Sequence, residues 1–133
     1  MANSQQQAAN WLSFLLTQDV PFNELLRSHV AIGKISELCN CGCHGFGFEV
    51  PAQATVRPLQ EGAGVFYELA FASNHPEEIT MLLFTDERGY LSWIDVTYGA
   101  CNIDPMPDGI APANKIGVWP GTRHDLPRVD AAD

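Results

Sequence analysis

The N-terminal part of the chain has hydrophobic residues at helical spacing. Ser4 followed by Gln7 matches a capping box, which predicts an amphipathic helix over residues 5–17. Pro21 suits the first turn of a second helix, and Gly33 is expected to end it. The apolar faces of the two helices consist of Ala8, Trp11, Leu12, Leu15 and Leu16, and of Phe22, Leu25, Leu26 and Val30.

After Gly33 the hydrophobic period changes to that of β-strands. A strand from Ile35 runs into the cysteines, and residues 45–50 return from a turn rich in Asn and Gly. Later strands are expected at residues 65–72, 79–86 and 90–99, and the stretch Met81 to Thr85 is apolar enough for a central strand. The order predicts an α+β domain, with two N-terminal helices packed on a mostly antiparallel sheet of about five strands in a meander.

The pattern fades after Ala100, where prolines interrupt the chain. Residues 115–121 are expected to form at most one short edge strand. The chain is therefore predicted to be a single domain over residues 1–133, whose parts are a helical region (1–32), a sheet (33–99) and a Pro-rich irregular tail (100–133).

Composition and charge narrow the classes of function. The apolar fraction of 46% is typical of a globular protein, and 16 acidic against 7 basic residues give a net charge of -9. This charge repels phosphate backbones and argues against nucleic-acid binding, whereas it favours a basic protein partner. Without a basic leader or a stretch of about 20 apolar residues, the chain is expected to be cytoplasmic and to bind no membrane.

The run "CNCGCHGFGF" holds the candidate metal ligands. Cys39, Cys41, Cys43 and His44 offer the donor atoms that zinc takes, although their spacing is not the usual C-x-x-C, and Cys101 can replace His44. Cys39, Cys41 and Cys43 are expected at a hairpin where at least two sulfurs come near each other. Three interpretations stay open: packed free thiols, a bound metal, or a disulfide such as Cys39 with Cys101. Cys43 and His44 as nucleophile and base are disfavoured, because neighbours in a strand point to opposite faces. No enzymatic activity is expected.

Acidic residues at turns are the candidate partner-binding groups. Turns are the usual place of solvated acids, so a hydrolytic pair is not expected. Asp95 differs because it lies inside an apolar strand, where it either faces solvent or anchors a partner. In a meander, Glu77 and Glu78 should lie at the opposite sheet end from Asp86 and Glu87. The full set is Glu77, Glu78, Asp86, Glu87, Asp95, Asp104 and Asp108, of which Asp104 and Asp108 are expected to join Glu77 and Glu78.

Three motifs resemble those of a group of small bacterial proteins without assigned function. They are "CNCGC" (39–43), "LLFTDERGYLS" (82–92) and "IDV" (94–96), and the resemblance covers roughly residues 10–108. It implies an α+β fold and no established activity. His44 departs from the pattern, because the group has Pro or a small residue after the third cysteine. In size and charge the chain also looks like the immunity proteins that neutralise bacterial toxins.

These observations give two functional hypotheses. The first is a non-enzymatic acidic interaction or inhibitor domain, with an immunity-type protein as its concrete form, that binds a basic partner. The alternative is a small metal-binding protein that holds zinc in the "CNCGCH" cluster (39–44).

Overall fold

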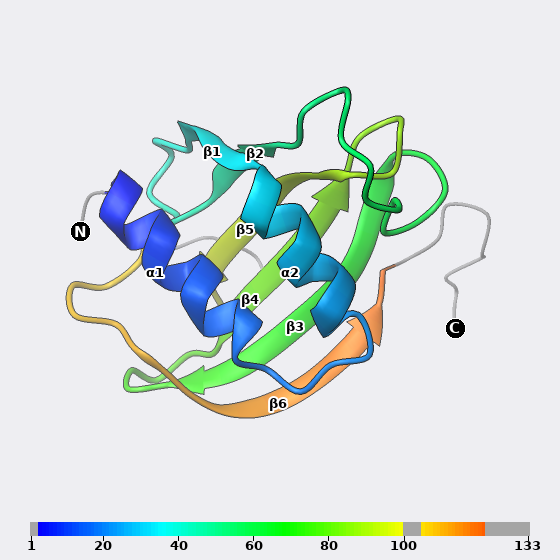
Figure 1. Ribbon diagram of the computed structural model, residues 1–133. Coiled ribbons are helices and arrows are strands. Elements are labelled where there is room, and N and C mark those ends of the chain that lie inside the picture. The colour runs from blue at the N-terminus through cyan, green and yellow to red at the C-terminus, as the bar shows by residue number, and fades with distance from the viewer. Residues whose placement is uncertain (1–2, 100–104, 122–133) are drawn as a thin grey trace.

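The computed structural model describes residues 3–99 and 105–121, which form an α+β fold. Its elements are α1 (Gln5–Leu16), α2 (Asn23–Ile32), β1 (Lys34–Leu38), β2 (Phe46–Glu49), β3 (Gly64–Ser73), β4 (Ile79–Thr85), β5 (Leu91–Tyr98) and β6 (Pro112–Pro120). Both helices lie across one face of a six-stranded antiparallel sheet (Figure 1). The predicted class and the predicted position of the helices are confirmed.

Helix α1 begins where the capping box places it. The Ser4 hydroxyl oxygen accepts a hydrogen bond from the Gln7 backbone N–H at 3.0 Å. The helix ends at Leu16, and Thr17 closes the last turn by donating its backbone N–H to the Phe14 carbonyl. In α2 the backbone N–H of Gly33 donates to the His29 carbonyl, so this helix also ends where the glycine predicts.

The strand order is β1-β2-β5-β4-β3-β6, and every neighbouring pair is antiparallel. Strand β4 is therefore central, as predicted, and it shares the middle of the sheet with β5. The predicted meander is correct for β3, β4 and β5 only. The hairpin of β1 and β2 is added beside β5, where Phe46 pairs with Ile94 and Gly47 with Trp93. Residues 50–63 then carry the chain from β2 across to β3.

The expected count of about five strands is too low, because the sheet has six. The additional strand, β6, starts at Pro112 and pairs with β3 along most of its length. Prolines stand at both ends of β6 and none lies between them, so its backbone N–H groups are available for pairing. Strand β6 is the edge of the sheet, which is where flanking prolines are tolerated.

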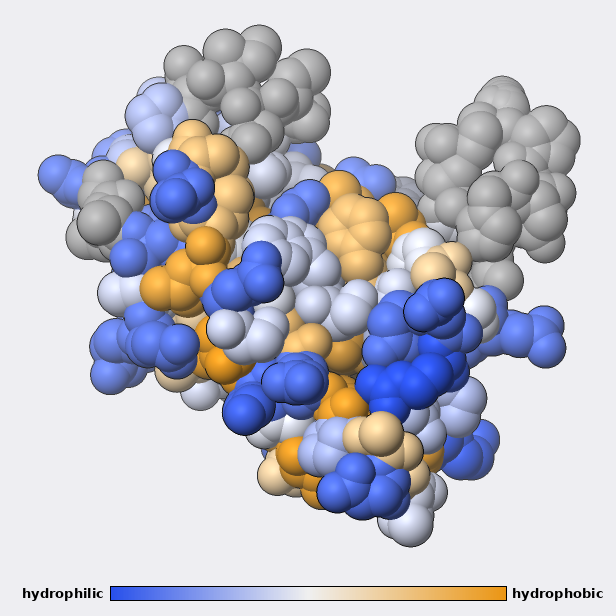
Figure 2. All heavy atoms as spheres, turned by 90° about the horizontal axis from the view of Figure 1, so that it is seen from above, coloured by the Kyte–Doolittle hydropathy of each residue, from blue (hydrophilic) through white to orange (hydrophobic). Residues whose placement is uncertain are grey.

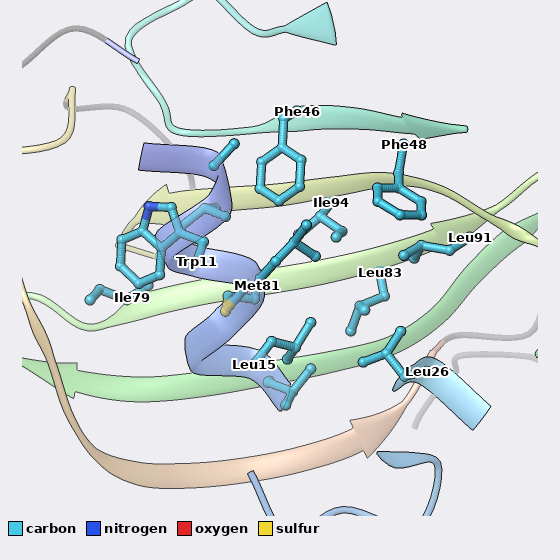
Figure 3. Close-up of a cluster of buried hydrophobic side chains, with 14 of the residues drawn as sticks. Trp11, Leu15, Leu26, Phe46, Phe48, Ile79, Met81, Leu83, Leu91 and Ile94 are labelled. Carbon is cyan, nitrogen blue, oxygen red and sulfur yellow. The ribbon is translucent and has the colours of Figure 1, made fainter. Parts of the chain in front are cut away.

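The hydrophobic core lies between the helices and the inner face of the sheet (Figure 3). On β4 the residues Ile79, Met81 and Leu83 are fully buried, at the spacing of two that one face of a strand requires. The helices contribute Trp11, Leu15 and Leu26, and the neighbouring strands contribute Phe46, Phe48, Leu91 and Ile94.

The connection from β2 to β3 is held against the sheet end farther from the cysteines. The ring of His29 is fully buried, and its Nε2 lies 2.7 Å from the Arg57 carbonyl oxygen. Leu91 donates its backbone N–H to the other ring nitrogen of His29 at 3.4 Å. The hydroxyl of Tyr90 donates to the Val56 carbonyl at 3.0 Å. These bonds join helix α2, the connection and the start of β5.

Little large apolar surface is exposed in the described part of the chain. Ile32, Ile116 and Trp119 are the exposed large hydrophobic residues among those described, at 41%, 54% and 47%. Figure 2, which views the molecule from the β1 side, shows hydrophobic atoms as small patches between polar side chains. Over residues 3–99 and 105–121, neither helix has the length and apolar character needed to cross a bilayer.

Candidate functional site

The three cysteines lie in the loop that joins β1 to β2, at one end of the sheet (Figure 1). Cys39 donates its backbone N–H to the Gly45 carbonyl at 2.9 Å, which closes the loop at its base. His44 donates its backbone N–H to the Val96 carbonyl at 3.0 Å and so fixes the loop to β5. Gly42 has a φ of 111°, a conformation that favours glycine, and it allows the chain to turn between the cysteines.

The sulfur atoms of Cys39, Cys41 and Cys43 form one cluster. The Sγ atoms of Cys39 and Cys41 are 2.8 Å apart, those of Cys41 and Cys43 are 3.3 Å apart, and all three lie within 4.8 Å of one another. Four thiolates at roughly 2.3 Å from one tetrahedral ion stand about 3.8 Å from each other, which is inside this range. The prediction that at least two sulfurs meet at the hairpin is therefore confirmed.

The loop backbone is held from two further sides. Asn3 donates its side-chain amide to the carbonyls of Cys39 and Gly45, at 3.2 and 2.7 Å. Met106 donates its backbone N–H to the Gly42 carbonyl at 3.0 Å. Because these bonds involve backbone groups, they fix the loop without using a cysteine sulfur. Asn3 and Met106 lie far from the cysteines in sequence, so nothing in the motif indicated them.

Burial differs among the three thiols. Cys43 is buried, Cys39 is half-buried and Cys41 is exposed. Burial raises the pKa of the Cys43 thiol to about 12, although the backbone N–H of Gly45, 3.3 Å from its sulfur, acts to lower it. Without an ion, Cys43 is therefore a thiol at neutral pH. A bound cation must displace its proton, which couples binding to pH.

His44 is not brought to the sulfurs. Its ring is fully buried, and its Nδ1 accepts a hydrogen bond from the indole N–H of Trp11 at 3.1 Å. That bond assigns the proton of the neutral ring to Nε2. His44 thus presents its Nδ1 to helix α1. The cluster of candidate ligands in the described residues contains Cys39, Cys41 and Cys43 and no histidine.

Asp95 lies next to the cysteine loop on the outer face of the sheet. Its neighbours Ile94 and Val96 are fully buried in the core, so the side chain of Asp95 points the other way. The indole N–H of Trp93 donates to Asp95 Oδ1 at 2.6 Å. A Cβ on Gly45 would stand 3.3 Å from Cys43 Sγ and 3.4 Å from Asp95 Oδ1. Gly45 therefore leaves open a space that the thiol and the carboxylate share.

The predicted acidic residues fall at two ends of the sheet. Glu77 and Glu78 precede β4, and Asp86 and Glu87 follow it, so the two pairs lie at opposite ends as predicted. Asp86 is engaged in its own turn, where it accepts from the backbone N–H of Tyr90 at 3.1 Å and pairs with the Arg88 guanidinium at 2.9 Å.

The segment of Asp108 lies beside the turn of Glu77. Asn74, in that turn, donates to the Gly109 carbonyl at 3.0 Å and accepts from the Ala111 backbone N–H at 2.9 Å. Asp108 therefore joins the end of the sheet that carries the cysteine loop, as expected. Two other candidates, Cys101 and Asp104, lie outside the described residues.

Comparisons of the chain with protein-family models, with curated proteins and with solved structures found no match. The resemblance to the small bacterial proteins stays a prediction, and the function is argued from the geometry of the cysteine loop.

Proposed function

We propose that the chain binds a thiophilic metal ion through the thiolates of Cys39, Cys41 and Cys43. The observation that carries the proposal is the convergence of the three Sγ atoms to within 4.8 Å of one another. Thiolates select soft and borderline ions such as zinc and copper(I). The anchored backbone of the loop supports the proposal, because the sulfurs are gathered before any ion arrives.

Packing of free thiols accounts for the cluster less well. A free cysteine is often buried as a small hydrophobe, and Cys43 fits that description. Cys41 is exposed and Cys39 is only half-buried, so removal of apolar surface from water does not explain why their sulfurs meet. Ion binding explains all three positions together.

Metal content and titration test this function. Protein purified under reducing conditions without chelator is expected to carry a stoichiometric thiophilic metal, or to take up one Zn²⁺ or Cd²⁺ with thiolate charge-transfer absorption. Cys41→Ser should abolish the uptake. Asn40→Ser, at an exposed position of the same loop, is the matched control and should retain it. Reduced wild-type protein that takes up no ion, or Cys41→Ser that binds like the wild type, would refute the function.

A second function is favoured by the acidic groups at the end of the sheet that carries the cysteine loop. Glu77 and Asp108 are exposed there, and Glu78 is half-buried beside them. An acidic interaction or inhibitor domain, of the immunity type, would use this surface to bind a basic protein in the cytoplasm. The net charge of -9 supports steering of such a partner. Charge reversal at Glu77 and Glu78 tests this candidate separately from metal binding.

A further inference from the structure

We infer that the cysteine site is built for a three-coordinate, trivalent thiophilic ion, with arsenic(III) as its representative. The inference rests on the proposed function and names the class of ion that this site selects. Two independent properties of the site carry it: the number of protein ligands, and the charge of the complex they would form.

The number of ligands fits a three-coordinate ion. In the part of the chain that the structure describes, the cluster consists of three cysteines, with no His, Asp or Glu as a fourth member. His44 presents its Nδ1 to Trp11 at 3.1 Å and is directed toward helix α1. Structural zinc sites are closed by four protein ligands. Arsenic(III) bonds to three sulfurs and carries a lone pair in the fourth direction, so three cysteines complete its coordination.

The net charge of the ion–thiolate complex also favours a trivalent ion. Three thiolates around a monovalent ion carry a net charge of minus two, around a divalent ion minus one, and around a trivalent ion zero. Cys43 is only 4% exposed, so a net charge on the complex is partly removed from water at a cost in free energy. The backbone N–H of Gly45 donates to Cys43 Sγ at 3.3 Å. A single weak donor offsets little of that cost.

Acidic side chains lie near the loop, and the N-terminal ammonium that lowers the pKa of Asp108 is offset by that carboxylate. Asp95 Oδ1 faces the space in front of Gly45, and the turn of Glu77 lies at the same end of the sheet. Three of the basic side chains are bound elsewhere: Arg27 to the Leu16 carbonyl, Arg88 to Asp86, and Lys115 to the Asp19 carbonyl. An anionic complex would be repelled by this environment, whereas a neutral complex is not.

The binding reaction balances without a redox partner. Arsenous acid, As(OH)₃, reacts with three thiols to give As(SR)₃ and three molecules of water. In each step an As–O bond and an S–H bond break, and an As–S bond and an O–H bond form, with arsenic and sulfur keeping their oxidation states. Cys41, which is exposed, is the entry ligand, and the buried Cys43 closes the site. Each thiol transfers its proton to the departing hydroxyl. The reaction therefore does not require a stable thiolate at Cys43.

Two arsenic(III) compounds that bind different numbers of thiols test the inference on the reduced full-length chain. With arsenite, native mass spectrometry should show one arsenic atom gained and three hydrogens lost, and equimolar Zn²⁺ should not displace it. Cys41→Ser should lose this species at equimolar arsenite. The same variant should still bind phenylarsine oxide, whose arsenic takes two thiols, and this binding shows that the variant is folded around the remaining pair.

The controls separate failure of the inference from failure of the proposed function. Asn40→Ser, at an exposed position of the same loop, is the matched control and should bind arsenite like the wild type. If Cys101→Ser loses arsenite binding, Cys101 is one of the ligands, and if Zn²⁺ binds with four ligands and displaces arsenite, the site is tetrahedral. Either result makes the inference wrong while the metal-binding function stands. If Cys41→Ser binds arsenite like the wild type, the three-thiol site is wrong. If the reduced wild type binds neither Zn²⁺ nor arsenite, both proposals fail.

Discussion

A buried hydrogen bond between Trp11 and His44 connects helix α1 to the end of the cysteine loop. The indole N–H is 3.1 Å from His44 Nδ1, and both side chains are almost completely buried. Trp11→Phe keeps an aromatic ring but removes the donor, which leaves a buried acceptor without its partner. Such a loss costs about 1–3 kcal/mol. We expect the free energy of unfolding in urea to fall by about that amount.

Trp119→Phe is the control for this prediction. Trp119 is 47% exposed on the edge strand, so the same replacement there changes little buried structure. Surface substitutions usually shift stability by less than about 0.5 kcal/mol. Equal destabilisation by the two variants would show that the Trp11–His44 bond contributes nothing specific.

The Cys43 thiol predicts a loss of stability in alkaline solution. Burial raises its pKa in the folded protein from 9.0 to about 12. Between these values the unfolded chain loses the proton while the folded chain keeps it, so the free energy of unfolding falls as the pH rises from 9 toward 12. We expect chemical unfolding of metal-free, reduced protein to show this slope. Cys43→Ala should flatten it, while Cys41→Ser, at an exposed thiol, should keep it.

The residues of the site were only partly predictable from the sequence. The alternation of Cys39, Cys41 and Cys43 around Gly42 indicated a turn with converging sulfurs, because that information is local. His44 shares the same motif but contacts Trp11, which lies in another element. The Asn3 contacts with the loop carbonyls are also long-range, and a single sequence has no local signal for them.

At the scale of elements, His29 joins helix α2 to two other parts of the chain. Its ring contacts the Arg57 carbonyl and the Leu91 backbone N–H, and burial lowers its pKa below the ordinary 6.5. The unfolded chain therefore takes up a proton at a higher pH than the folded chain. The contribution of His29 to the free energy of unfolding should be complete above about pH 6.5 and be lost as the pH drops below it. One such proton contributes a slope of at most about 1.4 kcal/mol per pH unit.

His29→Gln is the variant that checks this prediction. It removes the titrating ring, so the acid-side slope between pH 6.5 and the carboxylate range should become shallower. Leu25→Ala is the matched control in the same helix, since it removes half-buried apolar surface but retains His29. The control should lower stability at every pH and keep the wild-type slope. A slope that survives in His29→Gln would assign the titration to another group.

The elements themselves follow from local pattern where the pattern is strong. Helical spacing ending at Gly33, and the apolar run around Met81, were sufficient for both helices and for the central strand. The sequence pattern underestimates strand β6 because prolines usually interrupt strands, whereas Pro112 and Pro120 stand only at its ends. The position of the first hairpin beside β5 depends on pairing between Phe46 and Ile94. That pairing is long-range and leaves no periodic signal in either segment.

At the scale of the whole molecule, the charge is divided between the two ends of the sheet. The end with the cysteine loop carries Glu77, Glu78 and Asp108, and the opposite end carries Asp86 and Glu87. The acids of the second end are offset in part by Arg88, which pairs with Asp86 at 2.9 Å. An exposed pair of this kind contributes little to stability, but it lowers the net charge of that end. At the cysteine end the N-terminal ammonium lowers the pKa of Asp108 and offsets that carboxylate. Glu77 and Glu78 are therefore the acids of this end that we expect an approaching basic partner to meet.

Charge reversal at the two ends tests whether the acids of the cysteine end serve a partner. Glu77→Lys with Glu78→Lys should slow association with a basic protein and flatten its dependence on salt, because steering acts mainly on the association rate. Glu61→Lys with Glu87→Lys changes the net charge equally at exposed positions near the other end, and it should have a smaller effect. Stopped-flow association at low and high salt measures the rates of both variants, and unfolding in urea should be similar for all three proteins.

Equal slowing by the two double variants would mean that only net charge matters. If neither variant changes the rate, or if the native protein recovers no basic partner, these acids serve only to keep the protein in solution.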